Sequence, residues 1–558
     1  MSQSQQPNNT PPRPLIVVML LTALAAWGAV SLWGWIDFGP EQWQFYIPAL
    51  LAAYAAFHSI MIYLRINAFV MNQLLRRKAF QKTTSKGSAG WAEPKELQKA
   101  GLYDTRGVFV GTDRQGKPLF FDGEGHGLVL SPAGGGKTIS FCVPNLLHLD
   151  LPMIVTDLKG TLACITKKTR EKIFKQKVYC INPAQLFTDI LGRPARYNPL
   201  QILLDAWIAG QFKDIIADAR AIALQLLPEP KNAGENAYFR AGSRKLIVFC
   251  IVYLVTRDQP EKTTLCEVLH LIRNEKALID AFYIASCSDI LDGELADMAN
   301  DLLAKFTADD NKRQTESFRE GACQVLEVFS PSGHLADSIG ACDFRFKDLK
   351  IKAATVYIIA DPSRIEIFRP WIGLICWAAI TELTRAQNNK RVMILLDEAS
   401  NFYINNISNN LTALREYGLR IYFVLQELEE YARIYGKEAL ETLLSQTAVK
   451  LFMKVQSYNT AELISKLLGE RTIKLEQFNL GNTMLDPAQR SVAEAPRRLL
   501  LPDEVRQFAD TILFIKALPP IWAKKLGYHE VNPWKKWAGI NPLHGKRFKG
   551  KTRLTLHY

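Results

Sequence analysis

The sequence predicts an α/β fold in which a parallel β-sheet carries an inserted all-helical domain. Two observations lead to this fold class. The first is that short apolar runs, several of them rich in β-branched residues, alternate with polar turns and amphipathic stretches, as strands joined by crossover helices do. The strands that we expect are residues 128–130, 153–156, 177–181, 355–360, 392–396, 421–425, 449–453 and 511–515.

The second observation is a long interval without strand patterns, from about residue 202 to residue 340. It contains only segments with the periodicity of helices. The predicted helices are Asp214–Leu227, Phe239–Thr256, Thr264–Ala285, Asp292–Phe306 and Thr315–Phe329. The apolar run Leu246–Val255 is too short to span a bilayer, so we interpret it as part of a buried helix. The interval therefore predicts an all-α domain inserted into the α/β domain.

A glycine-rich turn follows the first predicted strand, and Lys137-Thr138 then opens a helix. This order is typical of a phosphate-binding loop, in which backbone N–H groups close around a polyphosphate, the lysine neutralises charge and the threonine ligates Mg²⁺. The pattern G-x-x-x-x-G-K-[ST] is broken once, since Ser131 replaces the first glycine. A glycine-rich loop of purely structural use is the alternative. The candidate nucleotide-binding residues are Gly134, Gly135, Gly136, Lys137, Thr138 and Ile139.

The segment Arg391–Glu398 is a second candidate element of a nucleotide site, because its apolar run ends in Asp-Glu. In P-loop enzymes a carboxylate at the end of a buried strand completes the Mg²⁺ shell, and a following glutamate can orient or deprotonate the attacking water. We therefore predict Asp397 as a metal partner, with Thr138, and Glu398 as the hydrolytic base. Two solvated acids at a strand end are the alternative, but the upstream loop favours the catalytic interpretation.

Several residues near other strand ends are weaker candidates. Gln426 ends a predicted strand and can sense a γ-phosphate, although a satisfied strand-end amide is the ordinary alternative. Arg415 and Arg420 precede the same strand, and an arginine presented across a subunit boundary can stabilise transition-state charge. We assign this role to Arg415 from its position. Asp157 and Lys159 follow the second predicted strand, at the edge where open α/β sheets bind ligands, but a simple loop ion pair explains them equally well.

Length and composition place the chain among multi-domain proteins with a reduced, cytoplasmic body. Its 558 residues are enough for roughly three or four structural units. The net charge of +13 weakly favours a polyanionic partner or a membrane surface. None of the nine cysteines forms a C-x-x-C pair, and the eight histidines show no metal spacing. A zinc site is therefore not expected.

Two apolar segments near the N-terminus predict a transmembrane hairpin. Leu15–Ile36 and Gln44–Leu64 contain no charged residue, and each is long enough to cross a hydrocarbon core. Basic residues follow the second segment, so the positive-inside rule places both termini in the cytoplasm. A cleaved signal peptide or buried core helices are the alternatives. The polar residues 1–14, before the hairpin, are predicted to be disordered.

The C-terminal segment Trp534–Tyr558 holds seven basic residues and no acidic one, with aromatic residues between them. Basic charge with aromatics suits single-stranded nucleic acid, on which aromatic rings stack. It also suits an anionic membrane surface or an acidic partner protein. A solvated basic tail is the ordinary alternative.

Taken in order, the motifs resemble the VirD4/TraG family of type IV coupling proteins, the membrane ATPases of conjugation and type IV secretion. The matching segments, which extend over nearly the whole chain, are KGSAGWAEPKEL (86–97), LVLSPAGGGKT (128–138), VPNLL (143–147), VTDLKG (155–160), YNPL (197–200), LLDEASNF (395–402), LQELEEYARIYG (425–436), SKLLGERT (465–472) and RRLLLPDEVRQF (497–508). Ser131 and the triple glycine depart from the commoner family loop, in which Thr-x-Ser often precedes Gly-Lys. Gly136-Lys137-Thr138 is intact.

The resemblance implies a RecA-like P-loop ATPase domain with an inserted all-α domain, preceded by an N-terminal two-helix transmembrane hairpin. It also implies a ring, a homo-hexamer at the bacterial inner membrane, with ATP and Mg²⁺ bound between subunits. A trans-acting Arg415 suits such a ring. The expected divisions are a disordered N-terminus (1–14), the hairpin (15–66), the nucleotide-binding domain in two parts (67–201 and 346–530), the all-α domain (202–345) and the basic tail (531–558).

The function implied by the resemblance is that of a membrane-anchored ATPase. It would bring a single-stranded DNA–relaxase complex, protein effectors or both to the channel proteins of a type IV secretion system, and its all-α domain would select the cargo. One alternative is a DNA pump of the FtsK/HerA kind, against which we find no long linker and no C-terminal winged-helix pattern. Another is a membrane-bound substrate receptor in which ATP only holds the ring together.

Overall fold

The computed structural model describes residues 53–67, 70, 84–229, 236–479, 489–548 and 550–558, in two units. The smaller unit combines residues 1–83 with 474–494, and the larger one residues 84–473 with 495–558. In the smaller unit residues 53–67 are helical. No helix of the described part is both long and apolar enough to cross a membrane. The predicted disordered N-terminus, the first predicted membrane segment and residues 44–52 of the second lie outside the described residues.

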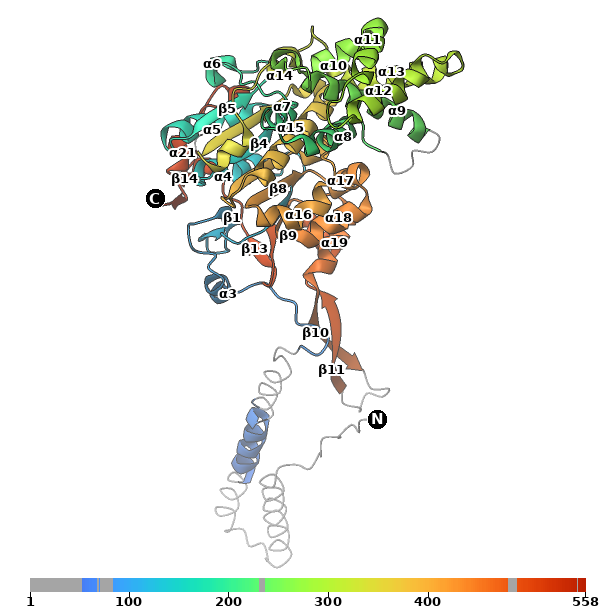
Figure 1. Ribbon diagram of the computed structural model, residues 1–558. Helices are drawn as coiled ribbons and strands as arrows, with labels where there is room; N and C mark the ends of the chain where they lie inside the picture. The colour runs from blue at the N-terminus through green and yellow to red at the C-terminus, as the bar shows by residue number, and fades with distance from the viewer. Residues whose placement is uncertain (1–52, 68–69, 71–83, 230–235, 480–488, 549) are drawn as a thin grey trace, which may run out of the picture. The chain divides into compact units, whose positions relative to one another are not determined.

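A nine-stranded sheet with the order β13-β12-β9-β3-β8-β7-β4-β6-β5 forms the centre of the larger unit (Figure 1). The seven strands β3 to β9 are parallel to one another. Strand β12 is antiparallel to both β9 and β13. Their bounds are β3 His126–Leu130, β4 Met153–Asp157, β5 Lys177–Ile181, β6 Ala354–Ile359, β7 Val392–Asp397, β8 Leu419–Leu425, β9 Thr447–Met453, β12 Thr511–Ile515 and β13 Ile521–Ala523.

Each of the eight predicted strands coincides with a strand of this sheet, whereas the other described strands were not predicted. Those are β13 and three two-stranded pairs. The pairs are β1 (Val108–Thr112) with β2 (Pro118–Phe121), β10 (Glu470–Asn479) with β11 (Gln489–Arg498), and β14 (Val531–Asn532) with β15 (Leu554–Thr555). A three-residue strand carries too little periodicity to be recognised, and proline or glycine interrupts the hairpin of β1 and β2.

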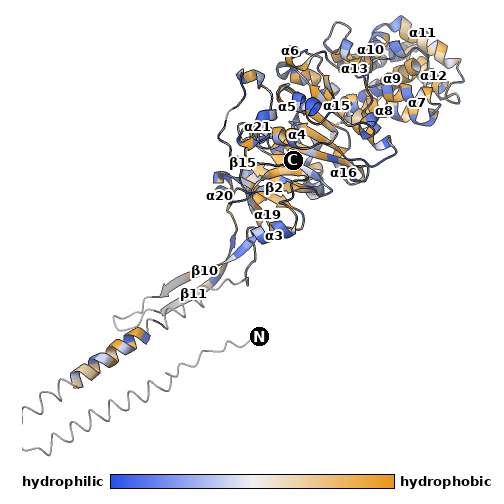
Figure 2. Ribbon diagram, turned by 90° about the vertical axis from the view of Figure 1, so that its left-hand side faces the viewer, coloured by the Kyte–Doolittle hydropathy of each residue, from blue (hydrophilic) through white to orange (hydrophobic). Residues whose placement is uncertain are grey.

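Both faces of the sheet are covered, because side chains alternate between two hydrophobic clusters along each strand. In β3, Leu128 and Leu130 belong to one cluster and Val129 to the other. The first face is covered by α15 (Ile365–Arg385), α16 (Ile407–Glu416), α17 (Leu428–Tyr435), α18 (Lys437–Gln446) and α19 (Tyr458–Leu468). The second is covered by η1 (Thr138–Cys142), α4 (Val143–His148), α5 (Thr161–Lys172) and the β1–β2 hairpin. Burial on both faces explains why the strands are nearly uninterrupted apolar runs, coloured mostly orange in Figure 2.

Nine α-helices of the described part lie between β5 and β6 in the chain, and those from α9 to α13 lie at the upper right of Figure 1. The nine are α6 (Thr188–Leu191), α7 (Gln201–Ile208), α8 (Ile215–Leu226), α9 (Asn236–Val255), α10 (Leu265–Arg273), α11 (Glu275–Ser286), α12 (Glu294–Phe306), α13 (Lys312–Leu326) and α14 (Leu335–Ile339). The segment predicted as one helix over Thr264–Ala285 is two helices. They meet at Asn274, whose side chain accepts a hydrogen bond from the N–H of Ala277 and so caps α11.

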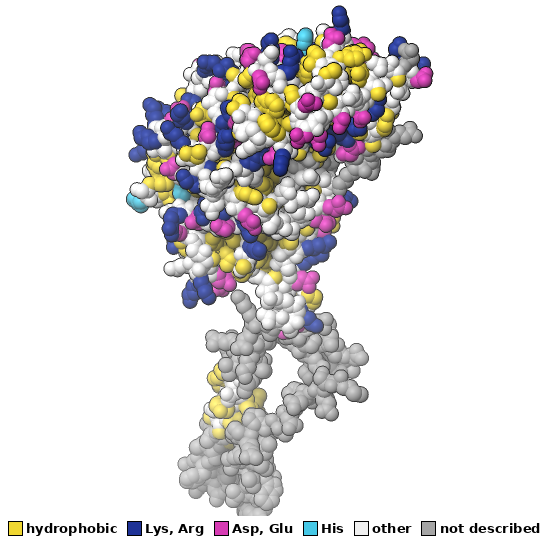
Figure 3. Space-filling model, in the orientation of Figure 1, with side chains coloured by type: hydrophobic (Ala, Val, Ile, Leu, Met, Phe, Trp, Pro, Cys, Tyr) yellow, Lys and Arg dark blue, Asp and Glu magenta, His cyan; other side chains and the backbone are white. Residues whose placement is uncertain are grey.

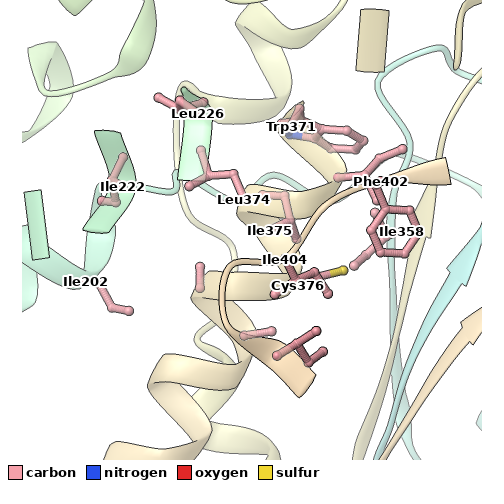
Figure 4. Close-up of a cluster of buried hydrophobic side chains, with 14 of the residues drawn as sticks. Ile202, Ile222, Leu226, Ile358, Trp371, Leu374, Ile375, Cys376, Phe402 and Ile404 are labelled. Atoms are coloured by element: carbon pink, nitrogen blue, oxygen red, sulfur yellow. The ribbon is translucent and has the colours of Figure 1, made fainter. Parts of the chain in front are cut away.

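Helix α15 joins the inserted helices to the sheet. Its side chains pack against α8 on one side and against the sheet on the other (Figure 4). Leu374 lies close to Leu226 of α8, and Trp371 lies on the side of Phe402 and of Ile358 from β6. One apolar cluster therefore runs from the central strands through α15 into the inserted helices, so that this domain is continuous with the core of the nucleotide-binding domain.

The C-terminal segment is folded onto the second face of the sheet. It contains α21 (Trp534–Trp537), and Trp534 is fully buried with its indole edge against Phe109. Its Nε1–H donates to the hydroxyl of Tyr558, at 2.6 Å, and the N–H of Gly539 donates to the carbonyl of Ile165 in α5. Trp534 is therefore not available to stack on a base. Lysine and arginine side chains gather at the surface around α5 and α21 (Figure 3).

We expect Trp534→Ala to destabilise the protein by about 3–5 kcal/mol, because it removes a fully buried indole from the core and leaves a cavity. The midpoint of thermal unfolding of the full-length protein measures this loss. Lys536→Ala, at an exposed position of the same helix, is the matched control and should leave the midpoint unchanged. An unchanged midpoint for Trp534→Ala would mean that the segment does not belong to the core.

Candidate nucleotide-binding site

The loop between β3 and η1 has the backbone geometry of a phosphate-binding loop. Gly134 and Gly136 have φ angles of 70° and 101°, which side chains rarely tolerate. At Gly135 a Cβ atom would lie 2.2 Å from the hydroxyl oxygen of Ser131. The side chain of Ser131 thus lies in the space that a side chain at position 135 would need. Gly135, the middle one of the three glycines, therefore accommodates the serine that breaks the motif.

The loop lysine is buried beside the carboxylates that end β7. Lys137 Nζ lies 3.8 Å from Asp397 Oδ1 and 4.0 Å from Glu398 Oε1. Neither Lys137 Nζ nor Asp397 Oδ1 has a hydrogen-bond partner among the described residues, although both are buried. Buried polar atoms are almost always satisfied in folded proteins, and exceptions mark binding sites. One unsatisfied cation and one unsatisfied anion side by side fit a polyphosphate with its divalent metal ion.

Thr138 and Ile139 begin the helix that follows the loop. Thr138 opens the π-helical turn η1, which continues directly into α4. The helix N-terminus therefore points its positive end and its free N–H groups at the loop, where an anion is stabilised. Ile139 is half-buried against the second hydrophobic cluster, so its side chain supports the turn and only its backbone faces the loop.

Asp397 and Glu398 have different environments although they are adjacent. Burial raises the pKa of Asp397 to about 6, against the opposing effect of the Lys137 ammonium. Glu398 adopts the left-handed backbone conformation, with φ of 56°. Its Oε1 lies 3.2 Å from Lys159 Nζ and its Oε2 accepts a hydrogen bond from Asn401 Nδ2, at 3.0 Å. Both oxygens of the predicted base are therefore held from opposite sides.

Asp157 lies at the end of β4 and is buried next to Asp397. Its Oδ2 accepts a hydrogen bond from the N–H of Ala163, at 2.8 Å. Burial, with a smaller contribution from the Asp397 charge, raises the pKa of Asp157 to about 7. Lys159 does not form the loop ion pair with Asp157 that the sequence allowed, because its ammonium pairs with Glu398 instead. Asn401, the other partner of Glu398, was not identified from the sequence.

Gln426 and Arg415 lie at opposite edges of the sheet. Gln426 follows β8 at the loop edge and lines a small cavity with Pro132. Arg415 is exposed at the end of α16, before β8 begins, and the seven residues of β8 separate the two edges by roughly 20 Å. Arg420 is buried, and its guanidinium donates to the Arg415 carbonyl and pairs with Glu124. Arg415 is thus the arginine free to contact another molecule, since its guanidinium has no partner among the described residues.

We expect Asp157→Asn to raise the thermal stability of the nucleotide-free protein at pH 8 and to have little effect near pH 4. The pKa of Asp157 is raised from 3.8 to about 7 on folding. Its contribution to stability is therefore complete below pH 4 and is lost as the pH rises through 7. An amide avoids the buried charge, which costs about 2–4 kcal/mol at pH 8.

Unfolding midpoints measured between pH 4 and pH 8 test this expectation. Asp503→Asn, at an exposed aspartate, is the control. A difference between Asp157→Asn and the wild type that stays constant over this range would contradict the burial argument.

The chain is similar in sequence to known proteins. It is 25% identical over 458 residues to VirD4 of Rhizobium radiobacter, which covers 79% of this chain and 64% of that protein. It is 23% identical over 498 residues to the conjugal transfer protein TraG of Escherichia coli, covering 79% of this chain and 76% of that protein.

Among solved structures, the unbound bacterial conjugative coupling protein TrwBdeltaN70 matches with a TM-score of 0.56 and 16% identity, over 80% of this chain and 93% of that one. TrwB in complex with ADP and Mg²⁺ matches with a TM-score of 0.53, over 78% and 94%. At this identity the likeness shows the fold alone. The family described as type IV secretory system conjugative DNA transfer matches residues 88–550, and this chain belongs to that family.

Proposed function

We propose that this chain is an ATP-driven coupling protein, which brings a DNA–relaxase complex, protein effectors or both to a type IV secretion channel. One observation carries the proposal. Lys137 Nζ and Asp397 Oδ1 form a buried ion pair of 3.8 Å at a glycine-rich loop, and neither atom has a hydrogen-bond partner among the described residues, as a site for a metal-bound polyphosphate requires. Membership of the conjugative DNA transfer family supplies the class of cargo.

ATP and Mg²⁺ are the ligands that these residues suit. The backbone N–H groups from Gly134 to Ile139 cradle the phosphates, and Lys137 neutralises their charge. The Thr138 hydroxyl and Asp397 hold Mg²⁺, which supplies neutralisation of the charge on the transferred phosphoryl group. Solved structures of TrwB contain ADP with Mg²⁺ and a non-hydrolysable ATP analogue, which supports the same ligands for this chain.

Glu398 is the base that orients or deprotonates the attacking water. Its position next to Asp397 puts its carboxylate beside the transferred group, and Lys159 and Asn401 fix its direction. Gln426, at the same edge of the sheet, contacts the γ-phosphate side of the site and reports its loss to α17 and α19. These roles follow from the position of each side chain at the loop edge.

The active assembly is a ring, with a homo-hexamer as the expected state, at the bacterial inner membrane. Arg415 supports a ring, because it lies too far from its own loop to contact a nucleotide bound there and is exposed toward other molecules. The segment from residue 15 to residue 66 anchors the ring, and both termini face the cytoplasm. The inserted helices select the cargo, and the channel proteins of the secretion system are the further partners.

We expect Glu398→Gln to bind ATP as the wild type does and to lose at least about 100-fold in hydrolysis rate, because only proton transfer and water orientation are removed. The measurement is ATP turnover and fluorescent-nucleotide binding by full-length protein in nanodiscs, with and without single-stranded DNA. Lys137→Ala is the paired control and should lose binding itself. Slow turnover in the wild type that Glu398→Gln leaves unchanged would favour a receptor without motor activity.

We expect Arg415→Ala to bind nucleotide normally and to lose about 10³-fold in turnover, because the transition-state charge loses its partner from the neighbouring subunit. Mixing Arg415→Ala with Lys137→Ala subunits should restore part of the activity. The second variant supplies an arginine to sites that the first variant fills with ATP. Mixtures that stay inactive would rule out action across a subunit boundary.

A further inference from the structure

The hairpin of β12 and β13 brings a second lysine to the phosphate-binding loop. Because β12 is antiparallel to both β9 and β13, strand β13 runs in the same direction as β9 and β3. Residues that follow β13 therefore emerge at the edge of the sheet where β3 leads into the loop. These residues are Lys524 and Lys525, which no nucleotide-binding motif of the sequence includes.

The two neighbouring lysines have different contacts. Lys524 pairs through its backbone with Thr112 of β1, and its Nζ donates to the carbonyl of Arg114, at 2.8 Å. Lys525 Nζ lies 3.4 Å from the carbonyl oxygen of Gly135. Its Cδ lies 3.8 Å from the point that a Cβ on Gly136 would occupy. Lys525 thus lies along the glycines of the loop, and Lys524 points away from it.

The surroundings of Lys525 favour a bound anion. No carboxylate lies within ion-pair distance of its ammonium among the described residues. Burial lowers the pKa of Lys525, the Lys454 ammonium lowers it further, and Asp510 opposes this only in part. Lys454 directly follows β9 and so belongs to the same edge. A half-buried ammonium next to another cation is unfavourable by itself, and a phosphate seated on the loop relieves both charges.

We propose that Lys525 is a second phosphate-binding lysine of the nucleotide site, contributed by the same subunit as Lys137. This inference rests on the proposed nucleotide site and adds to it a residue from the far end of the nucleotide-binding domain. The β12–β13 hairpin becomes part of the site through Lys525, and a nucleotide bridges the loop to this hairpin.

The test compares variants that separate charge from hydrogen bonding. In full-length protein in nanodiscs, the affinity for fluorescent ATP with Mg²⁺ is measured together with the unfolding midpoint without nucleotide. Lys525→Ala and Lys525→Gln should each weaken binding about tenfold, and Lys525→Arg should stay within about threefold of the wild type. Lys524→Ala is the matched control and should bind as the wild type does. None of the four should lower the midpoint, and Lys525→Ala and Lys525→Gln should raise it slightly, because they remove an ammonium that is unfavourable without a bound anion.

Other outcomes overturn the inference in distinguishable ways. Lys525 only supports the Gly135 carbonyl if Lys525→Gln binds ATP as the wild type does. The same conclusion follows if Lys525→Ala lowers the unfolding midpoint without nucleotide and Lys525→Gln has the midpoint of the wild type. This inference alone fails if the wild type and Lys525→Ala both bind ATP and Lys137→Ala does not bind it. If the wild type binds no nucleotide, or if Lys137→Ala binds as well as the wild type, the proposed function fails with it.

Discussion

The buried ion pair of Lys137 and Asp397, whose facing atoms have no hydrogen bond among the described residues, is the constraint on which the rest of this structure depends. Two ionised groups held out of water without hydrogen bonds are costly, and their mutual attraction at 3.8 Å repays this only in part. The fold can bear this cost because both groups sit at strand ends of a sheet that is covered on both faces. Burial of the two hydrophobic clusters offsets the free energy that the buried charges cost.

The same covering determines where chemistry can occur. With helices on both faces and parallel strands between them, polar side chains are accessible only at the strand ends. Lys137, Asp157, Asp397 and Gln426 all follow or end strands at one edge, although they are far apart in the sequence. Asp157 shows how strongly burial acts at this edge, since burial keeps its carboxyl group protonated up to about pH 7.

The strands and the loop could be predicted from the sequence because their signals are local. Each central strand is a continuous apolar run, and Gly136-Lys137-Thr138 has one common structural meaning. Asn401 and Lys525 could not be predicted in the same way. The Asn401–Glu398 contact is local, but no residue pattern marks it. Lys525 reaches the Gly135 carbonyl only through strand order and hairpin direction, which bring distant parts of the chain together. The break at Asn274 was missed for a related reason, because the apolar periodicity continues through the capping residue.

The position of the insertion also follows from the covering of the sheet. The helices between β5 and β6 share one apolar cluster with α15. Where they meet α15, their core is therefore the same as the core of the sheet domain. The sheet on the α15 side is therefore connected to α8 by direct packing through α15. Gln426 and Glu398 directly follow β8 and β7, strands that α15 and α16 cover, so one packed apolar cluster connects this edge of the sheet to the inserted helices.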